Sequence, residues 1–97
     1  MYNRSKLPIE TEFALRKLCE NYPEYKYLID DALEEALDQE YREMMREDIS
    51  LYRGYANSPL SSMMGERTYK NSKYRAKLML CDRFNLPTTE EQYAEIV

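Results

Sequence analysis

The chain has 97 residues, a formal net charge of −4 and no histidine, so it fits one domain and lacks the commonest general base, metal ligand and pH switch of proteins. Its two glycines, Gly54 and Gly65, are too few for a glycine-rich phosphate loop or a dinucleotide-binding fingerprint. The longest apolar run, residues 78–81, is far shorter than the roughly 20 residues that a membrane helix needs.

Four prolines divide the chain into predicted helices. Pro8, Pro23, Pro59 and Pro87 each stand where a helix can begin, because proline is tolerated in a first turn and disfavoured further inside. No stretch alternates apolar and polar residues for long enough to predict a β-strand. Ten tyrosines and six methionines supplement a small set of aliphatic residues, so we expect helices whose aromatic side chains reach the surface.

The first predicted helix covers residues 8–20. Ile9 and Phe13 fall on its charged side, where either the N-terminal arm or another helix covers them, or they anchor a partner. The opposite face is predicted to be buried and contains Ala14, Leu15, Leu18, Cys19 and Tyr22.

The two cysteines, Cys19 and Cys81, lie on separate predicted helices and lack the spacing of metal ligands. The N-terminal segment has no apolar run of the kind that directs secretion. We therefore expect a cytoplasmic protein with two buried thiols, and a Cys19–Cys81 disulfide remains the alternative.

The second predicted helix is long, from about residue 23 to residue 53, and ends near Gly54. Glu40, Glu47 and Asp48 interrupt its apolar stripe. We therefore expect this face to be core only as far as about Met45, and the remainder to project, bend or bury a different side. The stripe consists of Ile29, Leu33, Ala36, Leu37, Tyr41, Met44, Leu51 and Tyr55.

Residues 54–68 have weak helix propensity and are predicted to form a connection with one turn starting at Ser58. A third helix is predicted over residues 69–85, and a short final helix over residues 89–97, where Thr88 and Glu91 have capping-box spacing. The sequence thus predicts an all-α protein: a single domain over residues 1–97, built as a compact bundle of about four helices with one long central acidic helix.

Acidic residues concentrate in the long helix. Residues 30–48 hold nine of them against two arginines, and several like charges stand four residues apart, which destabilises an isolated helix. Three interpretations remain open: a solvated face, a face that docks the basic third helix, and a surface for a positively charged partner. The candidate partner-binding residues are Asp30, Asp31, Glu34, Glu35, Asp38, Glu43 and Glu47.

A basic stripe on the third helix is the alternative site. Its lysines stand three and four residues apart and therefore share one side of the helix. There they can contact phosphates while a tyrosine stacks on a base. A solvated face, or one paired with acids of the same chain, is the simpler interpretation. The stripe consists of Arg67, Lys70, Lys73 and Lys77, with Tyr74 beside them.

The residues therefore favour a non-catalytic module that binds a protein partner with a basic surface. We expect no catalytic residues, no cofactor and no metal site, because the chain lacks the histidines of helical di-iron sites and has no loop of calcium-binding spacing. Ordered carboxylates can replace a nucleic-acid backbone at a partner such as a nuclease, as in phage-encoded anti-CRISPR inhibitors; this is an analogy of function without a shared motif. Direct nucleic-acid binding through the basic stripe is the alternative function, and a homodimer is compatible with either.

Overall fold

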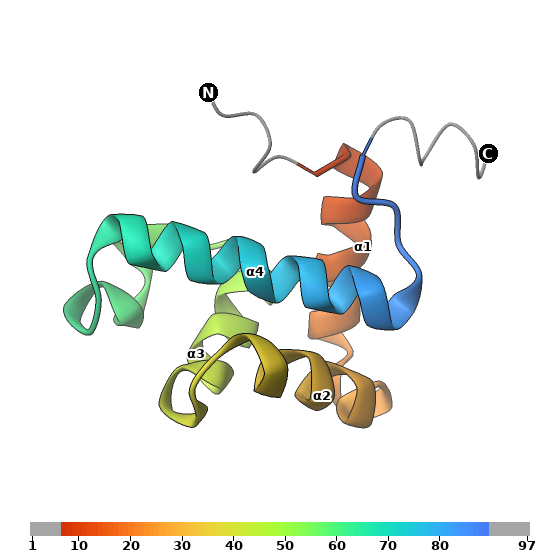
Figure 1. The fold of residues 1–97 in the computed structure, drawn as a ribbon, viewed down its shortest axis with the longest axis horizontal. Coiled ribbons are helices and arrows are strands. Elements are labelled where there is room, and N and C mark those ends of the chain that lie inside the picture. The colour runs from red at the N-terminus through yellow and green to blue at the C-terminus, as the bar shows by residue number, and fades with distance from the viewer. Residues whose placement is uncertain (1–6, 90–97) are drawn as a thin grey trace.

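The computed structural model describes residues 7–89, and 77% of these residues are helical with no β-strand among them. The predicted all-α class is confirmed (Figure 1). The α-helices are α1 (Ile9–Glu20), α2 (Lys26–Ala36), α3 (Gln39–Ser50) and α4 (Glu66–Phe84). Short 3₁₀ helices connect them: η2 (Tyr22–Glu24), η3 (Tyr55–Asn57) and η4 (Pro59–Ser62).

The prediction of one long central helix is wrong, because the chain turns between α2 and α3. Leu37 and Asp38 both adopt extended backbone, with ψ angles of 151° and 153°. The turn buries the Leu37 side chain, and Arg42 Nε donates a hydrogen bond to the Leu37 carbonyl at 2.8 Å. A continuous helix would instead keep Glu34 and Asp38 one turn apart, where like charges repel.

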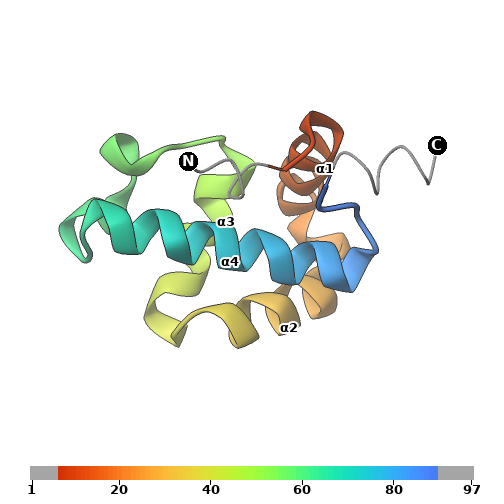
Figure 2. The same ribbon diagram turned by 45° about the horizontal axis from the view of Figure 1, so that its top comes forward.

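The four helices form two packed pairs around a common core. Helix α2 packs along α4, and α1 packs against α3. Figures 1 and 2 show α4 crossing the molecule beside α2, with α1 inclined steeply to α4. The largest fully buried apolar side chains come from all four helices and from η4: Leu15, Ile29, Leu33, Met45, Leu60, Tyr69 and Leu80.

The predicted faces of α1 and α2 agree with the buried residues, and the predicted face of α3 agrees as far as Met44, since Tyr41 and Met44 pack against the core. Helix α3 buries Met45, Asp48 and Ile49, whereas Leu51, a member of the predicted stripe, is 63% exposed. Beyond Met45 the chain therefore buries a different side, which contains Asp48 and Ile49. Burial of a different side was one of the three outcomes expected for this part of the stripe. The predicted final helix over residues 89–97 lies almost wholly outside the described residues.

A residue with left-handed backbone lies shortly after the last residue of α3 and of α4. At the end of α4 this residue is Asn85, with φ of 56°, and asparagine tolerates that conformation well. At the end of α3 it is Tyr52, with φ of 57°, and the Arg53 amide donates to the Asp48 carbonyl across it. A tyrosine there is strained by roughly 1–2 kcal/mol, whereas glycine or asparagine would adopt this conformation more easily.

Candidate functional site

Part of the predicted acidic face is neutralised within the chain. Arg83 of α4 donates from Nε to Asp31 at 2.6 Å and from its terminal nitrogen to Glu35. Asp30 accepts from the Tyr22 hydroxyl at 2.7 Å and from Lys26 at 2.9 Å. Docking of the acidic segment on the basic helix, one of the three open interpretations, is therefore present for Asp31 and Glu35, but it uses Arg83 rather than the lysine stripe.

Three of the four remaining predicted acids are free of such pairing. Glu34, Asp38 and Glu43 are exposed, and none of them forms an ion pair within residues 7–89. Glu47, the last predicted member, lies 3.8 Å from Arg53 Nη2. We name the unpaired carboxylates at the α2–α3 turn the acidic corner, which consists of Glu34, Asp38, Glu40 and Glu43.

Two shallow hollows are lined by residues of the acidic corner. Glu34 and Asp38 line one of them with Tyr41, and Glu40 and Glu43 line the other. Hydrogen bonding to Glu40 raises the pKa of the Tyr41 hydroxyl. The corner thus offers four carboxylates and a tyrosine hydroxyl on a fixed turn of the backbone.

One guanidinium, that of Arg42, stands within the acidic corner. Its Nε and Nη2 atoms donate to the Leu37 and Glu34 carbonyls at 2.8 and 3.5 Å. These carbonyls belong to the last turn of α2, where a positive charge is favourable. Arg42 therefore fixes the turn and leaves the neighbouring carboxylates unpaired.

The predicted basic stripe does not form one continuous surface. Lys70 pairs with Glu66 on its own helix at 3.0 Å, and Arg67 is exposed. Tyr74 is partly buried against the core. Lys73 and Lys77 instead enter a cleft between α4, the start of α1 and the end of α3, so the structure separates the stripe into an exposed half and a cleft half.

A buried carboxylate beneath this cleft was not among the predicted sites. Asp48 is fully buried and accepts hydrogen bonds from Arg53 Nε at 2.7 Å, Tyr69 Oη at 2.8 Å and the Ser58 hydroxyl. Burial, together with the bond to Asp48, raises the pKa of the Tyr69 hydroxyl. In the sequence, Asp48 interrupts the apolar stripe of the second predicted helix. That interruption could have indicated a buried acid, but it does not identify the side chains that bind it.

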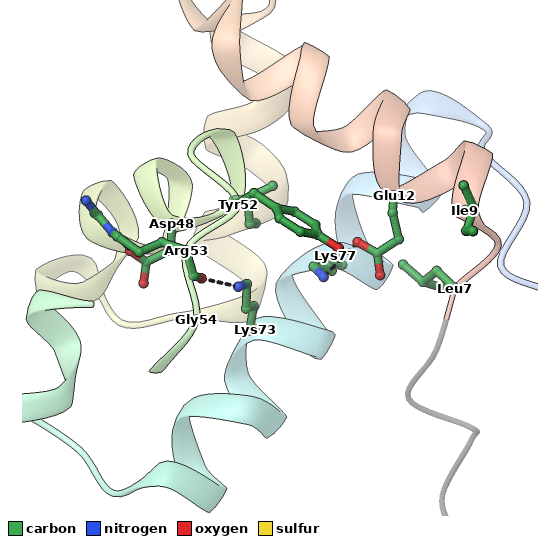
Figure 3. Close-up of a pocket in the computed structure, with 10 residues that line it drawn as sticks. Leu7, Ile9, Glu12, Asp48, Tyr52, Arg53, Gly54, Lys73 and Lys77 are labelled. Carbon is green, nitrogen blue, oxygen red and sulfur yellow. Dashed lines mark hydrogen bonds and ion pairs between the residues drawn. The ribbon is translucent and has the colours of Figure 1, made fainter. Parts of the chain in front are cut away.

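The cleft above Asp48 has a volume of about 480 Å³ (Figure 3). Lys73 Nζ donates to the Arg53 carbonyl at 2.6 Å, and Lys77 Nζ lies 2.8 Å from Glu12. Burial lowers the pKa of the Lys73 ammonium, and the charge of Lys77 lowers it further. Figure 3 shows the Tyr52 ring directed toward Lys77 and Glu12, while the Arg53 guanidinium points the other way.

Among residues 7–89, no group of three or more His, Cys, Asp or Glu side chains is placed to hold a metal ion. No helix in that range combines the length and the apolarity that crossing a bilayer requires. Comparison of the chain with protein-family models, with curated proteins and with solved structures finds no match. A function for the chain must therefore be inferred from its own side chains.

Proposed function

We propose that the protein is a non-catalytic binding module whose acidic corner engages a positively charged surface of a protein partner. The observation that carries the proposal is the contrast between two sets of acids on one segment. Asp31 and Glu35 are neutralised by Arg83, whereas Glu34 and Glu43 are exposed without an ion pair in the described part of the chain. The unpaired set contributes like-charge repulsion to the fold, and no ion pair within residues 7–89 offsets it.

The rigidity of the corner supports the same proposal. Arg42 holds the turn through the carbonyls of α2, and Arg83 ties α2 to α4. Backbone positions on such a frame keep their spacing before a partner arrives, so little backbone freedom is lost on binding. Complementary charge of this kind accelerates association and selects the partner.

A nucleic-acid-binding protein is the partner class that fits a fixed array of negative charges. Its binding surface is positively charged because it neutralises phosphates, and ordered carboxylates can occupy the same positions. In this proposal the protein acts as an inhibitor that mimics nucleic acid, in the cytoplasm, in the manner of phage-encoded inhibitors of nucleases. Direct binding of nucleic acid through the lysine stripe has less support, because Lys73 and Lys77 lie in the cleft, apart from the exposed Arg67 and Lys70, and form no continuous surface with them.

The test compares two variants that remove the same number of charges. Glu34→Gln with Glu43→Gln changes the acidic corner, and Glu10→Gln with Glu24→Gln removes two other exposed carboxylates, on α1 and η2. Proteins captured from a native lysate by the wild-type chain are identified, and their affinities for all three chains are measured. We expect the corner variant to lose about tenfold or more in affinity, or about 1.4 kcal/mol, and the control variant to bind normally.

Competition with a short DNA duplex tests the mimicry directly. The captured partner should release the protein when the duplex is added, because both occupy one basic surface. Equal losses in the corner and control variants would show that net charge alone matters and would contradict the proposal. A partner that binds the duplex and this protein at the same time would contradict the mimicry.

A further inference from the structure

The side chains that line the cleft beside Asp48 carry a net positive charge, because Arg53, Lys73 and Lys77 face only Glu12 and Asp48 there, while Glu47 lies outside the lining at 3.8 Å from Arg53 Nη2. Asp48 is neutralised by Arg53, and Glu12 is neutralised by Lys77. Lys73 donates to a carbonyl and lies 5.6 Å from the centroid of the Tyr69 ring, but it forms no ion pair with any carboxylate in the described range. A partly buried ammonium without a counter-ion is costly, and its charge faces a space that is large enough for a small ligand.

The remaining lining of the cleft is apolar. Leu7, Ile9 and Ile49 line it together with the Tyr52 side chain. Ile9 is 79% exposed and Tyr52 is 74% exposed, so both present apolar surface to an incoming molecule. Apolar walls with a few converging polar groups are the usual composition of a small-molecule site.

The conformation of Tyr52 is a second, independent indication. Its left-handed backbone is strained, and glycine or asparagine would fill the same position more easily. The ring makes one described aromatic interaction, with the Arg16 guanidinium at 5.9 Å from its centroid, and otherwise lies at the wall of the cleft. Strained residues persist where a function needs them.

We infer that this cleft binds a small carboxylate that carries an apolar or aromatic body. The carboxylate would lie against Lys73, which supplies the single uncompensated charge, with Lys77 as its neighbour. The body would lie against Ile9, Ile49 and the Tyr52 ring. The site shares no lining residue with the acidic corner, so this function is separate from the proposed partner binding.

The experiment titrates the whole chain with phenylacetate and follows its backbone amide signals by NMR. We expect saturable shifts at Tyr52, Gly54, Lys73 and Lys77. The neutral analogue phenylacetamide lacks the charged carboxylate, and acetate lacks the aromatic ring. Each should therefore bind about tenfold more weakly than phenylacetate. Shifts confined to other residues, or no saturation with phenylacetate, would overturn the inference.

Two lysine variants provide a matched control. Lys73→Gln should weaken phenylacetate binding about tenfold, whereas Lys70→Gln, on the same helix but exposed and outside the cleft, should bind as the wild type does. Circular dichroism establishes that each variant is folded. If Lys73→Gln does not fold, the comparison of phenylacetate with phenylacetamide on the wild-type chain still decides, and equal affinities would overturn the inference.

Phenyl phosphate tests the charge assigned to the ligand. A doubly charged head exceeds the one uncompensated charge of the cleft, so we expect it to bind no more tightly than phenylacetate. Tighter binding of phenyl phosphate would overturn the assignment of a carboxylate.

Discussion

The Arg53 guanidinium donates from Nε to the Asp48 carboxylate at 2.7 Å, across the end of α3. Asp48 also accepts from Tyr69, so this one carboxylate joins α3, the following connection and α4. Arg53 Nη2 is buried and has no hydrogen-bond partner among the described residues. The Asp48 carboxylate thus occupies a buried position where the helical pattern predicts an apolar side chain.

Asp48→Asn should therefore destabilise the protein strongly. The amide keeps the shape of the carboxylate but removes its charge. It also replaces one of the two acceptor oxygens by a donor, so either Arg53 or the pair of Ser58 and Tyr69 loses its acceptor. We expect a loss of about 3 kcal/mol in the free energy of unfolding, at the low end for a broken buried pair because Arg53 is partly exposed. Urea denaturation measures it. Glu47→Gln, next in sequence and 3.8 Å from Arg53 Nη2, should cost less than about 0.5 kcal/mol; equal costs would contradict the role of Asp48.

The pairing of Arg83 with α2 should appear as coupling between substitutions. Arg83→Gln and the double change Asp31→Asn with Glu35→Gln should each be destabilising alone, and their combination should cost less than the sum. Because Asp31 and Glu35 are 58% and 53% exposed, we expect a coupling energy of about 1 kcal/mol or less. Added salt should reduce it. Strict additivity would show that these ion pairs do not hold α2 against α4.

Tyr52→Gly should stabilise the fold by about 1 kcal/mol, because glycine adopts the left-handed conformation without strain. Asn85→Gly at the matching position of α4 should change stability by a few tenths of a kcal/mol, since asparagine is already suited to it. Thermal unfolding compares the two variants. A destabilised Tyr52→Gly variant would mean that the contact of Tyr52 with Arg16 outweighs the strain.

The two thiols should be protected in the folded protein. Burial raises the pKa of Cys19 to about 12 and that of Cys81 to about 11, so almost no thiolate forms near neutral pH. We expect slow reaction with a thiol reagent in the native state and rapid reaction of two thiols in denaturant without reductant. Fewer than two reactive thiols in denaturant would indicate a disulfide.

The same thiols predict how stability changes at alkaline pH. Between the unfolded pKa near 8.5 and the raised folded values, the unfolded chain releases protons that the folded chain keeps. The unfolded state then binds fewer protons, so the free energy of unfolding decreases as pH rises above about 8.5. Cys19→Ala with Cys81→Ala should show a smaller decrease over this interval in urea denaturation experiments, and an unchanged decrease would assign it to other groups.

The helical class, and the buried faces of α1 and α2, were determined by the sequence alone. Leu15 and Cys19 in α1, and Ile29 and Leu33 in α2, recur at helical spacing and are all buried. Periodicity identifies such faces because each residue's neighbours on a helix are local. The absence of histidine and the concentration of acids in residues 30–48 are likewise read directly from the sequence.

Contacts between distant segments determine which acids remain unpaired and where the helix turns. The turn at Leu37 and Asp38 depends on burying Leu37 and on Arg42 reaching the carbonyls of α2. The division of the acidic face depends on Arg83, which lies 52 residues from Asp31 in the chain. Asp48, Tyr69 and Lys73 likewise meet through contacts between distant segments. The periodicity of residues close in sequence cannot determine such contacts, because they arise from the packing of whole helices against one another.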